Sequence, residues 1–170
     1  LVTNGTYDEL GSELVTNGTF DADSDWNTSG GSDASISGGK ANFVNAAKGQ
    51  RVQQNFSFTA DKTYKIVIVI SNYSGSGNLG FYMGGDYAIS NISANGTYTL
   101  FHTPTNTTEA FFRAMTTSAL HTFSVDSITV KQVDPNDRWS LTNTTIENGV
   151  LNFVDNTSAA QFAVHTNTSM

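Results

Sequence analysis

The chain of 170 residues contains no cysteine. Disulfide bonds, thiolate zinc sites and cysteine nucleophiles are therefore excluded. Long apolar segments are lacking as well. The longest strongly apolar run, Ile66 to Ile70, is far shorter than the roughly 20 residues that a membrane-spanning helix requires. The sequence therefore predicts no insertion into a membrane.

Charged residues are scarce, at 14% of the chain, and most of them are acidic. Eight Lys and Arg against 15 Asp and Glu give a formal net charge of −7. A surface of this sign repels the phosphate backbone of nucleic acids, and no cluster of basic residues in the sequence offsets it locally. We therefore do not expect nucleic acid among the partners.

The residues that are abundant favour strands and turns. Hydrophobic residues make up 38% of the chain, and Gly, Ser, Thr and Asn fill much of the remainder. This composition suits an all-β domain with many turns, whereas a helical bundle needs more Ala, Leu, Glu and Lys. The 11 Phe and 6 Tyr residues are enough to build a core, so the composition does not indicate disorder.

Two internal repeats organise the sequence. Residues 1–8, LVTNGTYD, recur as LVTNGTFD at 14–21, and the pattern Ile-x-x-Gly-x-x-Asn-Phe at 36–43 recurs 110 residues later at 146–153. A spacing of this size is typical of tandem modules, because solenoid repeats run to roughly 20–50 residues.

This repetition predicts three parts of the chain. Residues 1–12 form a leading strand or linker, residues 13–133 a complete module, and residues 134–170 the opening of a second, similar module. The boundary lies at 133–137, where Val-Asp-Pro-Asn-Asp has the composition of a turn.

Short strands punctuated by Gly and Asn fill the complete module. In residues 62–71, Tyr64, Ile66, Ile68 and Ile70 alternate with Val67 and Val69, which predicts a central strand with both faces covered or one face at an interface. Further strands are expected at 51–59, with Phe56 and Phe58 on one face, and at 79–83, 97–103, 110–115 and 122–130. The expected fold class is all-β, an antiparallel β-sandwich or barrel.

Four segments in order resemble carbohydrate-binding modules of the family 4/9/22-like group. They are Glu13 to Asp21 followed by Trp26, the stretch 36–43, Asp61-Lys-Thr-Tyr64 leading into the apolar strand, and Phe123-Ser-Val-Asp126-Ser-Ile-Thr-Val130. The resemblance covers nearly all of 13–133. It implies an antiparallel jelly-roll β-sandwich, as found in polysaccharide-degrading enzymes and in phage tail-fibre and other virion proteins.

The resemblance also implies a structural calcium ion, which in many such modules joins the first strand to the last. The matching positions are Asp21 and Asp126, although the family more often has Glu where this chain has Asp21. The alternative is that Asp21 caps a turn and Asp126 faces solvent.

Sugar binding requires flat aromatic surfaces and polar groups that receive hydroxyls. Five residues are candidates for exposed ligand contacts, although Trp26 could instead close the end of the sandwich. They are Trp26, Tyr73, Tyr82, Tyr87 and Arg113. In the expected strands, Tyr82 lies out of phase with Phe81, and Arg113 lies out of phase with Phe112, so both point to the face opposite those phenylalanines.

Catalysis has little support in the sequence. The three histidines, His102, His121 and His165, lack the spacing of a metal motif, and the chain has no Gly-x-Ser-x-Gly elbow. We therefore expect no enzyme. The predicted function is a non-catalytic carbohydrate-binding module of a multi-module extracellular or virion-surface protein, with a polysaccharide or cell-surface glycan as partner.

Two alternatives remain at this point. The sandwich could be a structural or assembly component of a virion fibre or filament, in which the spare repeat in residues 1–12 pairs with an exposed sheet edge. It could also be the accessory module of a polysaccharide hydrolase.

Overall fold

The structure is a computed structural model that describes residues 9–107, 109–115, 120–134, 139–142, 144–147, 150–153 and 162–165. All regular secondary structure in these residues is β-strand. None of the described residues belongs to a helix that is long and apolar enough to cross a membrane.

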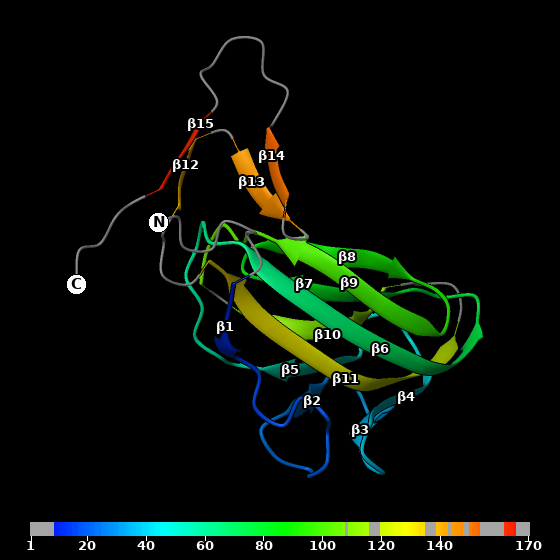
Figure 1. The fold of residues 1–170 in the computed structure, drawn as a ribbon. Coiled ribbons are helices and arrows are strands. Elements are labelled where there is room, and N and C mark those ends of the chain that lie inside the picture. Colours follow the sequence, from blue (N-terminus) through cyan, green and yellow to red (C-terminus); the bar gives the residue numbers. More distant parts are fainter. Residues whose placement is uncertain are drawn as a thin grey trace.

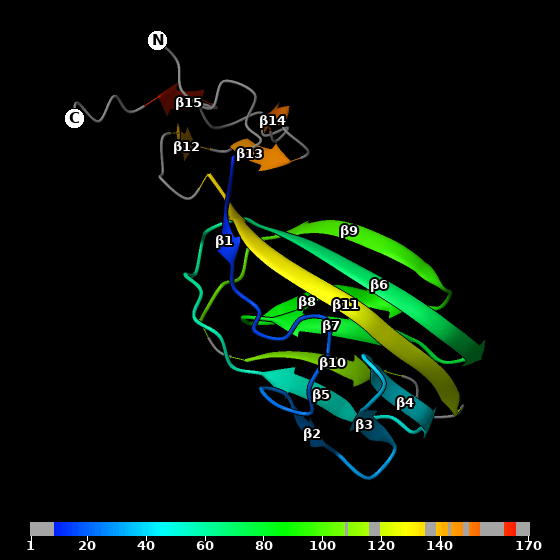
Figure 2. The same ribbon diagram turned by 60° about the horizontal axis from the view of Figure 1, so that its bottom comes forward.

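Two antiparallel sheets face each other in residues 10–133 (Figures 1 and 2). The first has the order β3-β4-β11-β6-β9, with β1 also paired to β11, and the second has the order β2-β5-β10-β7-β8. The six strands of the first sheet are β1 (Leu10–Glu13), β3 (Ala34–Ile36), β4 (Ala41–Ala46), β6 (Tyr64–Gly75), β9 (Gly96–His102) and β11 (His121–Val133). The five strands of the second are β2 (Asn27–Ser29), β5 (Arg51–Gln54), β7 (Leu79–Met83), β8 (Asp86–Ile92) and β10 (Ala110–Ala114). The predicted all-β, antiparallel sandwich is confirmed.

The core lies between the two sheets and is rich in aromatic rings. Phe112 of the five-stranded sheet contacts Phe81 and Trp26, with ring centroids 4.8 and 6.4 Å apart, and Trp26 contacts Phe20 at 5.0 Å. All four rings are at most 6% exposed. Burial of these rings, together with the aliphatic side chains of the same core, holds the two sheets together.

The central strand predicted at 62–71 is confirmed and corresponds to β6. It lies between β11 and β9, and its residues Tyr64, Ile66, Ile68 and Ile70 are buried in the core. Val67 and Val69, on the opposite face, are half-buried. One face of this strand is thus packed against the core.

The strand predicted at 51–59 is shorter than expected, because β5 ends at Gln54. Phe56 and Phe58 still pack against the core, but the backbone here passes from the five-stranded to the six-stranded sheet. The hydroxyl of Tyr64 receives a hydrogen bond from the N–H of Thr59 at 2.8 Å. A crossing segment of this kind keeps the alternation of a strand without having a strand to pair with.

Residues on both sides of the predicted module boundary at residue 13 belong to the six-stranded sheet. In β1, Leu10 pairs with Val133, and the N–H of Asp134 donates to the carbonyl of Glu9 at 3.0 Å. The spare repeat at 1–8 lies outside the described residues, so its pairing with another sheet edge stays a prediction.

Four further strands follow residue 134. They are β12 (Trp139–Thr142), β13 (Thr144–Glu147), β14 (Val150–Phe153) and β15 (Phe162–His165), of which β12 pairs with β15 and β13 with β14. The β13–β14 hairpin has the same register as β3–β4, at an offset of 110 residues. The pairs are Ala34–Phe43, Ser35–Asn42 and Ile36–Ala41 in the first, and Thr144–Phe153, Thr145–Asn152 and Ile146–Leu151 in the second.

A side-chain contact is repeated as well. The amide of Asn42 donates to the carbonyl of Lys40 at 3.4 Å, and that of Asn152 donates to the carbonyl of Val150 at 3.3 Å. The sequence repeat at 36–43 and 146–153 is therefore also a repeat in structure.

Candidate functional site

The outer face of the five-stranded sheet carries the candidate site. Val52, Phe81 and Phe112 are fully buried and point into the core. Because side chains alternate along a strand, their neighbours in sequence point outward. Register places these outward residues in two parallel rows that run across the sheet.

The tyrosine row crosses all five strands. Its members, each paired with the next, are Asn27, Gln53, Phe111, Tyr82 and Tyr87. Directly opposed side chains of antiparallel strands lie close enough to contact each other. The row therefore joins two amide side chains to three aromatic rings on one continuous surface.

The arginine row lies two residues along each strand. Its members, each paired with the next, are Ser29, Arg51, Arg113 and Gly80. The two arginines are directly opposed on β5 and β10, and both are half-buried. Two guanidinium groups thus lie beside the aromatic rings of the tyrosine row.

The three rings of the tyrosine row form one cluster. Tyr82 stacks on Phe111 with centroids 4.7 Å apart and 10° between the ring planes. Tyr87 meets Tyr82 edge-on at 5.3 Å and Phe111 at 6.4 Å. Phe111 is only 5% exposed, whereas Tyr82 and Tyr87 are half-buried. The tyrosines are therefore the accessible rings, and Phe111 supports them from within.

The arginines are held by contacts with this cluster. The guanidinium of Arg51 lies over the ring of Phe111, 5.3 Å from its centroid, and its Nε donates to the hydroxyl of Ser29 at 3.0 Å. Nη1 of Arg113 donates to the hydroxyl of Tyr87 at 3.5 Å. These contacts orient both cations on the outer face of the sheet.

Gly80 gives the ring of Tyr87 its position. A Cβ atom at residue 80 would lie 2.9 and 3.0 Å from two carbons of that ring and 3.1 Å from the sulfur of Met115. Real Cβ atoms are rarely this close to other heavy atoms, so a side chain here would displace the ring. The absence of a side chain at residue 80 lets Tyr87 lie across the sheet backbone.

Comparison with known proteins bears on the fold. No family model and no curated protein matches this chain. A solved structure described as BiXyn10A CBM1, in its apo form, aligns with 72% of this chain and 98% of that chain, at 11% identity and a TM-score of 0.50. The chain has the jelly-roll fold of a carbohydrate-binding module. The resemblance predicted from the sequence is confirmed for the fold.

Two other solved structures align at lower TM-scores. The mannan binding module from Man5C, in bound conformation, covers 72% of this chain and 99% of that chain at 20% identity and a TM-score of 0.48. The CBM22-1 xylan-binding domain of Paenibacillus barcinonensis Xyn10C covers 74% and 97% at 11% identity and a TM-score of 0.46.

Three of the five predicted contact residues, Tyr82, Tyr87 and Arg113, come together on this face. The expected exposure of Trp26 is wrong. Its ring is 6% exposed, and its Nε1 donates to the carbonyl of Asn17 at 2.9 Å. The alternative stated for it, that Trp26 closes the end of the sandwich, agrees with its burial, because an indole whose N–H is satisfied can be buried at little cost.

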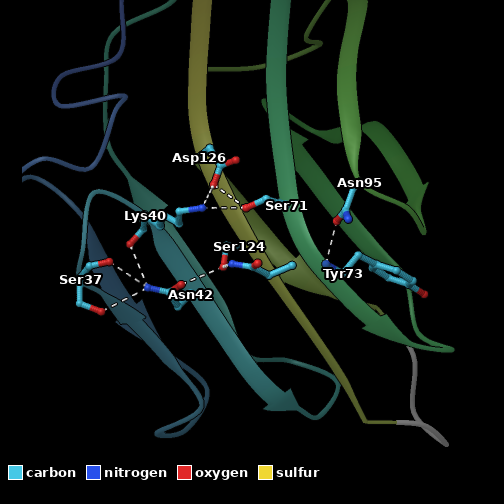
Figure 3. A network of polar contacts seen from close by, with 9 residues as sticks. Ser37, Lys40, Asn42, Ser71, Tyr73, Asn95, Ser124 and Asp126 are labelled. Carbon is cyan, nitrogen blue, oxygen red and sulfur yellow. Dashed lines mark hydrogen bonds and ion pairs between the residues drawn. The ribbon is translucent and has the colours of Figure 1, made fainter.

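Tyr73 belongs to β6 in the other sheet, so the structure does not bring it to this face. It packs against the core, and its hydroxyl donates to the carbonyl of Gly77 at 2.7 Å. Its backbone N–H donates to the side chain of Asn95 at 2.8 Å (Figure 3). These contacts give Tyr73 a structural role at the β6–β7 connection.

Sequence reasoning missed six residues of the two rows. They are Asn27, Ser29, Arg51, Gln53, Gly80 and Phe111. The alternation around Val52 indicates that Arg51 and Gln53 share a face, but their partners on β10 are about 60 residues away in sequence. Nothing local in the sequence gives that register.

The two carboxylates predicted to bind calcium have other partners. Asp126 lies 2.8 Å from the ammonium of Lys40 and accepts a hydrogen bond from Ser71 at 2.7 Å (Figure 3). Asp21 accepts a hydrogen bond from Thr19 at 2.6 Å. No group of three or more His, Cys, Asp or Glu in the described part of the chain is placed to hold a metal ion. A calcium ion at Asp126 would have to displace the Lys40 ammonium. Calcium binding stays an untested prediction.

Proposed function

We propose that the outer face of the five-stranded sheet binds carbohydrate without altering it covalently. The observation that supports this most directly is the tyrosine row, in which half-buried Tyr82 and Tyr87 share a surface with the amides of Gln53 and Asn27. Aromatic rings contact the apolar faces of sugar rings, and amides exchange hydrogen bonds with hydroxyls.

The members of the row have three different roles in this proposal. Tyr82 and Tyr87 contact sugar rings, and Phe111 fixes the ring plane of Tyr82 from below. Gln53 and Asn27, on the next two strands, offer both donors and acceptors. The row extends across all five strands of the sheet, which suits an extended polysaccharide.

The fold supports the proposal by analogy, since a solved structure that shares it is described as a carbohydrate-binding module. A polysaccharide target also places the module outside the cell. The same analogy allows it to be an accessory module of a polysaccharide hydrolase, with the catalytic domain elsewhere in a longer protein.

A panel of soluble polysaccharides, tested by affinity gel electrophoresis and then by calorimetry, examines the proposal. We expect at least one polysaccharide to bind, and Tyr82→Ala or Tyr87→Ala to weaken that binding roughly tenfold. The matched control is Phe101→Ala. Phe101 is a half-buried aromatic residue of β9 in the other sheet, so its removal leaves binding unchanged. Binding that survives both tyrosine substitutions would contradict this site.

We further propose that residues 134–170 open a second module. The shared register of β3–β4 and β13–β14, and the repeated asparagine contact, support this proposal. In the first hairpin Phe43 is fully buried and stacks on Phe123 of β11 at 4.4 Å. In the second, Phe153 is 60% exposed. A second module would cover Phe153 with a strand equivalent to β11.

A further inference from the structure

The sign of the charge on the candidate site differs from that of the whole chain. The formal net charge is −7, and the chain has only three arginines. Two of them, Arg51 and Arg113, are directly opposed on the outer face of the five-stranded sheet. Like charges placed opposite each other in a sheet destabilise it, so this arrangement calls for a compensating anion.

No acidic side chain supplies that anion in either row. The row members are Asn27, Ser29, Arg51, Gln53, Gly80, Tyr82, Tyr87, Phe111 and Arg113. Within the described ranges, neither Arg51 nor Arg113 forms an ion pair with a carboxylate. Asp86, at the start of β8, instead accepts a hydrogen bond from the N–H of Tyr87.

The other sheet provides a contrast. Lys65 of β6 and Lys131 of β11 are also directly opposed, but the next residue in that row is Glu13 of β1. The Glu13 carboxylate accepts hydrogen bonds from the backbone N–H groups of Val15 and Val130, so a negative charge lies in that row although no ion pair joins it to the lysines among the described residues. The arginine pair has aromatic and amide neighbours instead.

The guanidinium groups keep donors for a ligand. A guanidinium has five N–H donors in one plane. Arg51 uses Nε for Ser29, and Arg113 directs Nη1 at Tyr87 over 3.5 Å. The remaining donors of the two groups have no partner among the described residues. Such a planar set of donors suits the paired oxygens of a carboxylate or a sulfate.

We propose that the carbohydrate bound on this face is anionic, and that Arg51 and Arg113 bind its carboxylate or sulfate groups. The inference rests on the proposed function and narrows it. Tyr82 and Tyr87 contact the sugar ring while the arginine row, two residues away along the same strands, receives the charged substituent. Because the whole chain repels polyanions, binding of one reports recognition at this site rather than general attraction.

Matched pairs of polysaccharides that differ only in charge test the inference. The probes are polygalacturonate and alginate, each beside its carboxyl-reduced form, and dextran sulfate beside dextran. We expect that, in one of these pairs, the protein binds the charged polysaccharide tightly and does not bind the neutral polysaccharide tightly. A preference for a uronate over its reduced form identifies a carboxylate, and a preference for dextran sulfate over dextran identifies a sulfate.

Substitutions at Arg51 and Arg113 test whether these residues cause the preference for the charged polysaccharide. Arg51→Gln and Arg113→Gln each weaken binding of the charged form roughly tenfold or more, because each removes a charged hydrogen-bond donor. Replacing both arginines by lysine keeps the two positive charges but removes the planar set of donors. Because the charges remain, we expect this variant to bind the charged polysaccharide more tightly than a variant in which both arginines are replaced by glutamine. The control, Lys65→Gln with Lys131→Gln, removes two opposed cations from the other sheet and leaves binding unchanged.

The outcomes separate the inference from the function on which it rests. Equal binding of the charged and neutral forms, or glutamine variants that bind like the parent while Tyr82→Ala does not, would overturn the anionic ligand and leave sugar binding intact. If no polysaccharide of any charge binds, both proposals fail. Circular dichroism and melting of each variant show that it is folded.

Discussion

Tyr82 and Phe111 lie on neighbouring strands, with their rings stacked at 4.7 Å and inclined by 10°. Tyr82 is half-buried, while Phe111 is 5% exposed. The outer face of the sheet therefore has a small core of its own, in which Phe111 is the covered member.

Phe111→Ala should lower both stability and ligand affinity. The substitution leaves a gap beneath Tyr82 and Arg51, and losing a buried phenylalanine costs about 3 kcal/mol of unfolding free energy. Urea denaturation measures that cost, and calorimetry measures the affinity. Phe101→Ala, on the other sheet, should reduce stability without reducing affinity. An unchanged affinity in Phe111→Ala would show that Tyr82 does not depend on this support.

Gly80→Ala should weaken ligand binding through Tyr87. The new methyl group would lie within 3.0 Å of the Tyr87 ring, which must move away from the sheet. We expect a several-fold loss of affinity with a stability change of about 1 kcal/mol. A double-mutant cycle tests whether the loss of affinity is caused by displacement of the Tyr87 ring. If Gly80→Ala acts through the ring, its effect on binding disappears in a Tyr87→Ala background. An undiminished effect there would assign the loss to the backbone instead.

The ion pair between Lys40 and Asp126 should make a small contribution to stability. The side chains of the two residues are 35% and 29% exposed, and partly exposed pairs of this kind contribute roughly 0–1 kcal/mol. Lys40→Met should therefore lower the melting temperature slightly, and less so at high salt.

The ion pair between Lys40 and Asp126 also determines what we expect calcium to do to the melting temperature. Because the Lys40 ammonium already neutralises Asp126, we expect the melting temperature of the parent chain to be the same with calcium and with EDTA. A large rise in melting temperature on adding calcium would show that the ion displaces the lysine. Asp126→Asn serves as the control for any calcium effect at this position.

Removal of residues 135–170 should leave the first module folded. The two sheets and their shared core are built from residues 9–134, and the last contact of that unit is the hydrogen bond from Asp134 to Glu9. We expect the truncated chain to unfold cooperatively at a melting temperature within a few degrees of the parent. Loss of the cooperative transition would show that the two parts depend on each other.

Local periodicity predicted the strands whose side chains alternate clearly. The buried Ile66, Ile68 and Ile70 identified β6, and the phase of Tyr82 and Arg113 correctly placed both on an outer face. These inferences need only the period of a strand. The same rule overextended β5, because Phe56 continues the alternation after the backbone has left the sheet.

The site could not be assembled in the same way. Arg51 and Arg113 are brought together by pairing of β5 with β10, which is set by packing of the whole sandwich. For Trp26 the sequence leaves two alternatives, an exposed ligand contact or a residue that closes the end of the sandwich, and Phe20 and Phe112 bury its ring. Trp26 precedes β2, so the alternation of a strand does not determine whether its ring is buried.

The central claim, that sugar binds on the outer face of the five-stranded sheet, is tested most directly by amide chemical shifts. An isotope-labelled chain is titrated with oligogalacturonate and with a neutral oligosaccharide from the panel. We expect the largest shifts at strands β5, β7, β8 and β10, around Gln53, Tyr82 and Arg113. Shifts concentrated on β6, β9 and β11, or none with any sugar, would contradict it.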